Sequence, residues 1–217
     1  MAEPGGSSKL GARIEVAVFG AVGLVGMLLL ALFGYSRYLH RTGNLALPAT
    51  LHAQVASSQA VIVPADFGKN TLSIPAQAVT APISAQHVDS RGYLGIPADV
   101  HDVGYYTGGG PLDGRTGDLV VAGHVNYVGQ GAGALGRIGS LKIGDALITR
   151  GSTVPQGWRV TGLTSYLKSD GLPASMFSAT GRRELTLVTC GGTLDRRAGS
   201  YLSNVVVIAV PVRTIVR

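Results

Sequence analysis

The chain of 217 residues has one cysteine, few aromatic residues (6%) and few charged residues (14%). A single cysteine excludes an intramolecular disulfide, and it excludes zinc sites that need several thiolates. The 18 lysines and arginines are scattered, with doublets only at 182–183 and 196–197, and no basic stripe interleaved with aromatics is present. Despite a formal charge of +6, the sequence gives nucleic-acid binding no support.

Glycine is abundant, with 32 residues, and turn residues separate short apolar runs from about residue 69 onward. Repeated short strands at a spacing of about 8–12 residues are typical of a β-barrel or sandwich, so we expect a mainly β fold. The segments expected to be strands are 71–79, 117–125, 145–150, 158–166, 184–190 and 203–212. A short helix over 133–141 and a helical turn over 172–177 are expected between them.

The amino-terminal part contains one long apolar run. Residues 16–36 have no charge over 21 positions, and a helix of that length covers roughly 30 Å, the thickness of the hydrocarbon core of a bilayer. The run is longer than the apolar core of a secretory signal, about 7–15 residues. We therefore expect a polar tail at 1–15, a transmembrane anchor at 16–36, a tether at 37–68 and a folded domain at 69–217.

The charges beside this run do not decide its orientation. Lys9 and Arg13 flank it on one side, and Arg37 and Arg41 flank it on the other. The positive-inside rule compares the number of basic residues on the two sides of a span, and here each side has two. Charge alone therefore leaves both topologies open.

The lone cysteine, Cys190, lies in "LTLVTCGG" and is expected to be the last residue of an apolar strand. One interpretation is a small buried core residue. The other is a nucleophile, which needs a nearby base or cation to stabilise its thiolate. His124, in "VVAGHVNY", also follows an apolar strand, and Arg196 and Arg197 come soon after the cysteine. If the two strand ends meet at one rim, thiolate attack, proton transfer and oxyanion stabilisation become possible, although each residue also has a structural interpretation.

The segments "TLVTC" and "AGHVN", with a basic residue after the cysteine, resemble the active-site signatures of sortases, the membrane-anchored cysteine transpeptidases of Gram-positive bacteria. The longer segments "GDLVVAGHVNYVGQGAGALGRIGSLKIGD" and "LTLVTCGGTLDRRAGSYLSNVVVIAVP" resemble the class F sortases of actinobacteria. The likeness covers roughly residues 70–217.

The resemblance implies roles for individual residues. Cys190 is expected to be the nucleophile that forms a thioacyl intermediate, and His124 the general acid and base. Many sortases have the arginine that positions substrate and steadies the oxyanion shortly before the strand that follows the cysteine loop. Here that place, 202–204, has no basic residue, so Arg196 is the first choice and Arg197 the second. The implied fold is a closed β-barrel of about eight strands with short helices, preceded by one transmembrane helix.

The resemblance also implies partners and a location. The expected substrates are secreted proteins with a C-terminal LPxTG-like sorting signal, and the acceptor is a peptidoglycan precursor or another cell-wall amine. No cofactor and no metal is expected. The chain is expected in the cell membrane through residues 16–36, as a single-pass protein with a cytoplasmic amino end and an extracellular catalytic domain.

Two other classes of extracellular cysteine enzyme do not fit the sequence, and one non-enzymatic alternative stays open. L,D-transpeptidases have a Ser-His-Gly-Cys cluster, but no histidine lies near Cys190. NlpC/P60 amidases place the cysteine before the histidine, whereas His124 precedes Cys190 here. The third alternative is a non-enzymatic, membrane-anchored β-domain that binds a cell-wall component and buries its cysteine.

Overall fold

A computed structural model describes residues 60–217. The expected tail, the transmembrane anchor at 16–36 and most of the tether lie outside the described residues. Among residues 60–217, no helix has the length and apolar character needed to cross a membrane.

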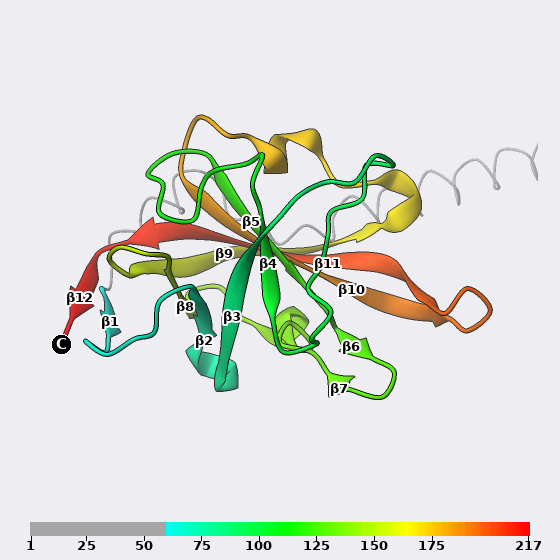
Figure 1. The fold of residues 1–217 in the computed structure, drawn as a ribbon, viewed down its shortest axis with the longest axis horizontal. Coiled ribbons are helices and arrows are strands. Elements are labelled where there is room, and N and C mark those ends of the chain that lie inside the picture. The colour runs from blue at the N-terminus through cyan, green and yellow to red at the C-terminus, as the bar shows by residue number, and fades with distance from the viewer. Residues whose placement is uncertain (1–59) are drawn as a thin grey trace, which may run out of the picture. The chain divides into compact units, whose positions relative to one another are not determined.

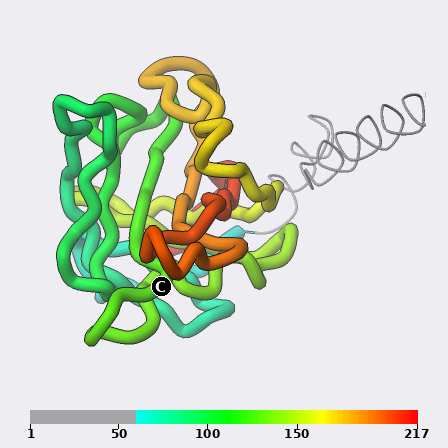
Figure 2. The backbone as a smooth tube through the Cα atoms, turned by 90° about the vertical axis from the view of Figure 1, so that its right-hand side faces the viewer, coloured from blue at the N-terminus to red at the C-terminus, as the bar shows by residue number. Residues whose placement is uncertain are grey.

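Eight strands close into a barrel, which confirms the expected mainly β fold (Figures 1 and 2). Around the barrel the order is β10-β11-β9-β8-β2-β3-β4-β5, so first and last strands of this order are also neighbours. The bounds are β2 Thr71–Ile74, β3 Val79–Gln86, β4 Val103–Tyr106, β5 Asp118–Gly123, β8 Ala146–Arg150, β9 Gln156–Leu167, β10 Glu184–Asp195 and β11 Ser200–Val212.

The barrel interior is filled by alternate side chains of its strands, as the period of two in a β-strand requires. Leu185 and Leu187 of β10 lie in the core, opposite Ala209 and Val207 of β11. Trp158 is also fully buried, and its indole Nε1 donates a 2.9 Å hydrogen bond to Oγ1 of Thr149. The residues of β10 between these core positions therefore face the outside of the barrel.

The expected strand at 71–79 is two strands joined by a turn. β2 ends at Ile74, the 3₁₀ helix η1 spans Pro75–Gln77, and β3 begins at Val79. Pro75 has no N–H to donate to a ladder, and Ala78 has a left-handed φ of 53° that turns the chain back. The result is an antiparallel β2–β3 pair rather than one long strand.

The two expected helical segments are single turns. The 3₁₀ helix η2 covers only Ile138–Ser140 of the expected helix over 133–141. Glycines at 133, 136 and 139 weaken a longer helix there because glycine loses the most backbone entropy on ordering. The 3₁₀ helix η4, Ala174–Phe177, lies within the turn expected at 172–177, and a further 3₁₀ helix, η3, spans Lys168–Asp170.

Two small sheets lie outside the barrel. β1, Val61–Val63, pairs in parallel with β12, Thr214–Val216, and it lies within the segment expected to be a tether. Its β-branched residues fit a strand, and Val61 and Val63 pack in a second buried cluster with Ile148. β6, Asn126–Tyr127, and β7, Gly131–Ala132, form a short hairpin directly after His124.

Candidate active site

The register between β5 and β10 places the histidine beside the cysteine. The two strands are parallel neighbours, and Val188 pairs with Ala122. Two residues further along each chain stand Cys190 and His124. Residues at matching positions of adjacent parallel strands are neighbours on one face, and the strands lie about 4.8 Å apart. The structure thus brings together two of the site residues predicted from the sequence.

Both side chains belong to the outer face of the barrel. Leu187 and Val121 are paired core residues, so their successors Val188 and Ala122 face outward, and Cys190 follows Val188 by two positions. His124 directly follows β5, and its Nε2 lies 3.1 Å from the carbonyl oxygen of Pro97. Because a carbonyl only accepts, Nε2 donates in this contact, which leaves Nδ1 as the ring nitrogen that could take a proton.

A buried hydrogen bond ties the two strands together between these residues. Oγ1 of Thr189 donates to the carbonyl oxygen of Gly123 at 2.8 Å. Thr189 is 5% exposed and directly precedes Cys190, while Gly123 directly precedes His124. The threonine of "TLVTC" therefore fixes the spacing between β10 and the end of β5 directly before Cys190 and His124.

The two glycines after Cys190 are required by close packing and backbone conformation. A Cβ at Gly191 would lie 2.5 Å from Cγ2 of Val205 on the neighbouring strand. Gly192 has a left-handed φ of 75°, within the irregular register between Gly191 and Leu194. Larger residues at either position would displace the strand segment that carries the cysteine.

Cys190 is a free, half-buried thiol at the border of a cavity of about 330 Å³. This cavity shares Val125 and Gly136 with a larger one of about 990 Å³. The larger cavity lies between the β6–β7 hairpin and the end of the β10–β11 hairpin. Tyr127, Leu194, Arg196 and Tyr201 are among the residues that line it.

Aromatic and amide groups connect the histidine to the larger cavity. The ring of Tyr127 makes an edge-to-face contact with His124, with 5.3 Å between the ring centroids. Asn126 Nδ2 donates a 2.9 Å hydrogen bond to the Tyr201 hydroxyl, which links the two hairpins. Tyr127 thus both contacts His124 and lines the larger cavity, which shares two lining residues with the cavity at Cys190.

The structure does not bring Arg196 or Arg197 beside Cys190. Asp195 pairs with Ser200 at the end of the β10–β11 hairpin, so both arginines lie in its terminal turn. Arg196 is six residues beyond Cys190, a distance of roughly 20 Å along an extended strand. Figure 1 shows this hairpin projecting beyond the barrel. The arginine nearest in sequence is therefore distant in space because the strand continues past the cysteine.

Arg137, which no sequence signal marked, lines the smaller cavity with Cys190. Its Nη2 donates to the carbonyl oxygen of Gln77 at 2.9 Å, and Nε2 of Gln77 donates back to the carbonyl of Arg137 at 2.6 Å. This reciprocal pair holds the segment before η2 against the turn after β2. A basic residue isolated among glycines has no pattern from which its position could be predicted.

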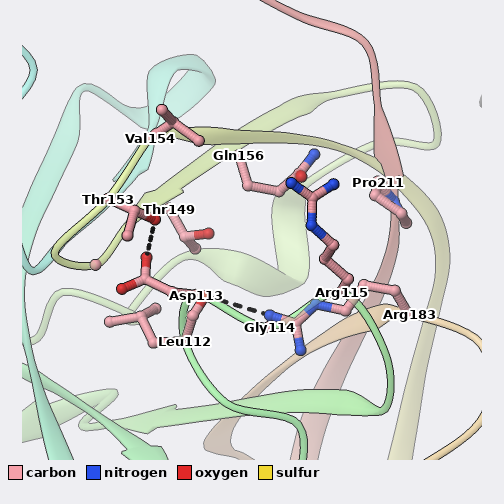
Figure 3. A pocket seen from close by; sticks show the side chains of 11 residues that line it. Leu112, Asp113, Gly114, Arg115, Thr149, Thr153, Val154, Gln156, Arg183 and Pro211 are labelled. Carbon is pink, nitrogen blue, oxygen red and sulfur yellow. Dashed lines mark hydrogen bonds between the residues drawn. The ribbon is translucent and has the colours of Figure 1, made fainter.

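A separate cavity of about 300 Å³ lies at the opposite end of β10 and is shown in Figure 3. Arg183 directly precedes β10, is 7% exposed and donates to the carbonyls of Pro111, Leu112, Thr116 and Gly117. Burial lowers the pKa of Arg183, and the negative charges of Asp118 and Asp113 offset this in part. Arg183 thus fixes the loop before β5.

Comparison with known proteins gives the family. A family model of the sortase domain matches residues 72–212. The chain belongs to the sortase family. No curated protein sequence matches it closely enough to count as a relative.

Solved sortase structures share its fold. Sortase E1 from Streptomyces coelicolor, solved with a tripeptide in its active site, is 22% identical with a TM-score of 0.50, covering 67% of this chain and 88% of that one. A sortase C-1 mutant from S. pneumoniae is 15% identical with a TM-score of 0.53, covering 68% of each chain. Sortase A from Corynebacterium diphtheriae is 19% identical with a TM-score of 0.50, covering 65% and 59%.

Proposed function

We propose that this sortase is a membrane-anchored cysteine transpeptidase that cleaves an LPxTG-like sorting signal and transfers the protein to a cell-wall amine. The observation that supports the proposal most is the position of Cys190 and His124. Each follows the last paired residues of the parallel strands β10 and β5, Val188 and Ala122, by two positions, and the Thr189–Gly123 hydrogen bond joins the two segments just before them. A thiol and an imidazole so placed are the nucleophile and base of acyl transfer.

The reaction begins at the sulfur of Cys190. The thiolate attacks the carbonyl carbon of the signal threonine, and the electron pair of the C=O bond moves to oxygen. When this tetrahedral intermediate collapses, the C–N bond breaks, and His124 donates a proton to the departing amine. The resulting thioester is attacked by the acceptor amine, whose proton passes to His124, and the thiol is released.

The large cavity beside the thiol is the proposed groove for the sorting peptide. At about 990 Å³ it has room for several residues of an extended chain, and it adjoins the cavity at Cys190. Arg196 lines this groove. Of the two roles expected for an arginine, its place favours the positioning of substrate, and Arg197 lies in the same turn.

The biological setting is part of the proposal. Residues 16–36 are the proposed single membrane span, with residues 1–15 in the cytoplasm and the catalytic domain outside. Secreted proteins with a C-terminal sorting signal are the proposed donors, and a peptidoglycan precursor or another wall amine is the acceptor. Within the family, the two long sequence segments support assignment to class F.

Cleavage of a small panel of LPxTG-like peptides by the full-length chain tests the proposal. The expected result is peptide cleavage that an added amine diverts to a transpeptidation product, with none by the Cys190→Ala variant. The alternative is a non-enzymatic domain that binds a wall component. It predicts no cleavage and a Cys190 that a thiosulfonate reagent labels only after denaturation.

A further inference from the structure

The chemistry at Cys190 needs a hydrogen-bond donor for the oxyanion, and Asn204 is in position to supply it. Cys190 on β10 pairs with Asn204 on the antiparallel strand β11. Opposed residues in such a pair project from the same face, with Cβ atoms about 4.5–5.5 Å apart. Asn204 is therefore much nearer to the sulfur than the arginines of the hairpin turn.

The burial pattern confirms that Asn204 faces outward with the thiol. Val207 and Ala209 of β11 lie in the barrel core, and Val205 packs against it. Asn204 has the opposite parity, like Cys190 on its own strand. Cys190 and Asn204 are thus neighbours on the outer face of β10 and β11, and His124 directly follows β5, the strand on the other side of β10.

The Asn204 amide has unused donor capacity. The residue is half-buried, and within residues 60–217 its side chain makes no hydrogen bond. Asn126, by contrast, uses its Nδ2 on the hydroxyl of Tyr201. A carboxamide has two N–H donors, and those of Asn204 are free to donate to a group bound beside Cys190.

We propose that Asn204 is a catalytic residue whose Nδ2–H donates to the oxyanion formed when the Cys190 thiolate attacks a carbonyl. The inference rests on the proposed acyl-transfer function. The sulfur–carbon bond forms, the C=O electron pair becomes the oxyanion, and the Asn204 N–H hydrogen-bonds to it without losing its proton. Collapse restores the carbonyl, expels the leaving group and leaves the thioester. A side-chain amide is one of the groups that form oxyanion holes in acyl transfer.

Two reactions of the same thiol separate this role from a structural one. Acylation of Cys190 by p-nitrophenyl acetate passes through an oxyanion, whereas alkylation by iodoacetamide is a direct displacement at carbon and does not. For the full-length Asn204→Ala variant, we expect the acylation rate to fall by about 10²–10³-fold. We expect the alkylation rate and its pH profile to match those of the unmodified protein.

Two further variants complete the test. Asn204→Asp keeps the size of the side chain but replaces the donor with a carboxylate, so acylation should fall at least as far as in Asn204→Ala. Tyr166→Phe is the matched control. Tyr166 lies on β9, where it pairs with Asn204 on the side of β11 opposite to β10, so it is two strands, about 10 Å, from Cys190. Its acylation rate should stay within about twofold of the unmodified protein.

Unchanged acylation in Asn204→Asp would overturn the inference, and so would an equal fall in acylation and alkylation. If acylation falls in Arg137→Gln but not in the Asn204 variants, the oxyanion donor is Arg137, which lines the same cavity as Cys190. Failure of the proposed function gives a different pattern. The ester still acylates Cys190 with the Asn204 dependence, but no sorting peptide is cleaved.

Discussion

The hydroxyl of Thr189 donates a buried 2.8 Å hydrogen bond to the carbonyl oxygen of Gly123. This bond joins the residue before the proposed nucleophile to the residue before the proposed base. It ties the two segments together directly before Cys190 and His124, so we expect the geometry of this pair to depend on it.

Thr189→Val tests that dependence. The substitution keeps the side-chain volume but leaves the buried Gly123 carbonyl without its donor, which costs about 1–3 kcal/mol of unfolding free energy. We expect a lower urea midpoint and a lower kcat for peptide cleavage. Thr189→Ser keeps the hydroxyl and should retain most of the activity. Full activity in Thr189→Val would show that other contacts set the spacing.

His124→Ala should lose most turnover, because general acid–base groups contribute about 10²–10⁴-fold in rate. The matched controls are His87 and His101, both exposed and outside the site. His87 Nδ1 contacts the Thr107 hydroxyl at 2.8 Å instead. Alanine at either control position should leave kcat within about threefold. Equal losses at all three positions would contradict the role of His124.

Arg183→Ala should reduce stability rather than chemistry. The change removes charged donors from the loop carbonyls and removes the positive charge that helps to lower the pKa of Asp118. Burial already raises the pKa of Asp118, which the Ser178 N–H and the charge of Arg183 counteract. Loss of hydrogen bonds from a charged group costs about 1.5–3 kcal/mol. Chemical denaturation measures this, and Arg183→Lys should restore little because lysine lacks the planar fork.

Much of this architecture follows from local pattern. The β5 and β10 segments were predictable because each is a short run rich in apolar residues between turn residues. His124 and Cys190 follow these two runs. The break at Pro75 could also have been predicted, because proline has no N–H to donate to a strand ladder. The prediction of one strand over 71–79 did not take this into account.

Other features depend on pairings that no local pattern encodes. Asn204 becomes significant only through its register with Cys190, set by a hairpin whose strands are 12 and 13 residues long. The same hairpin length separates Arg196 from the thiol. Arg137 reaches the cavity because a reciprocal contact with Gln77, 60 residues away, holds its segment there.

The carboxylate of Asp113 predicts a pH dependence of stability. Burial opposes its ionisation, but hydrogen bonds from Ser152 and Thr153 outweigh this and lower its pKa below the ordinary 3.8. A carboxyl with a lowered folded pKa stabilises the fold above its unfolded pKa, and the contribution is lost as the pH falls through the folded value. Asp113→Ala should therefore lower the urea midpoint at pH 7, and the difference should shrink below pH 3.8. A constant difference would contradict this assignment.

The proposed function requires the Cys190 thiol to form a thioester with the threonine of a sorting signal. Intact-protein mass spectrometry of the full-length chain, incubated with an LPxTG-like peptide without an acceptor amine, detects this thioester. We expect an adduct with the mass of the peptide through its threonine, located on Cys190, released by an added amine and absent from Cys190→Ala. Cleavage of the peptide by Cys190→Ala, or an adduct on another residue, would contradict it.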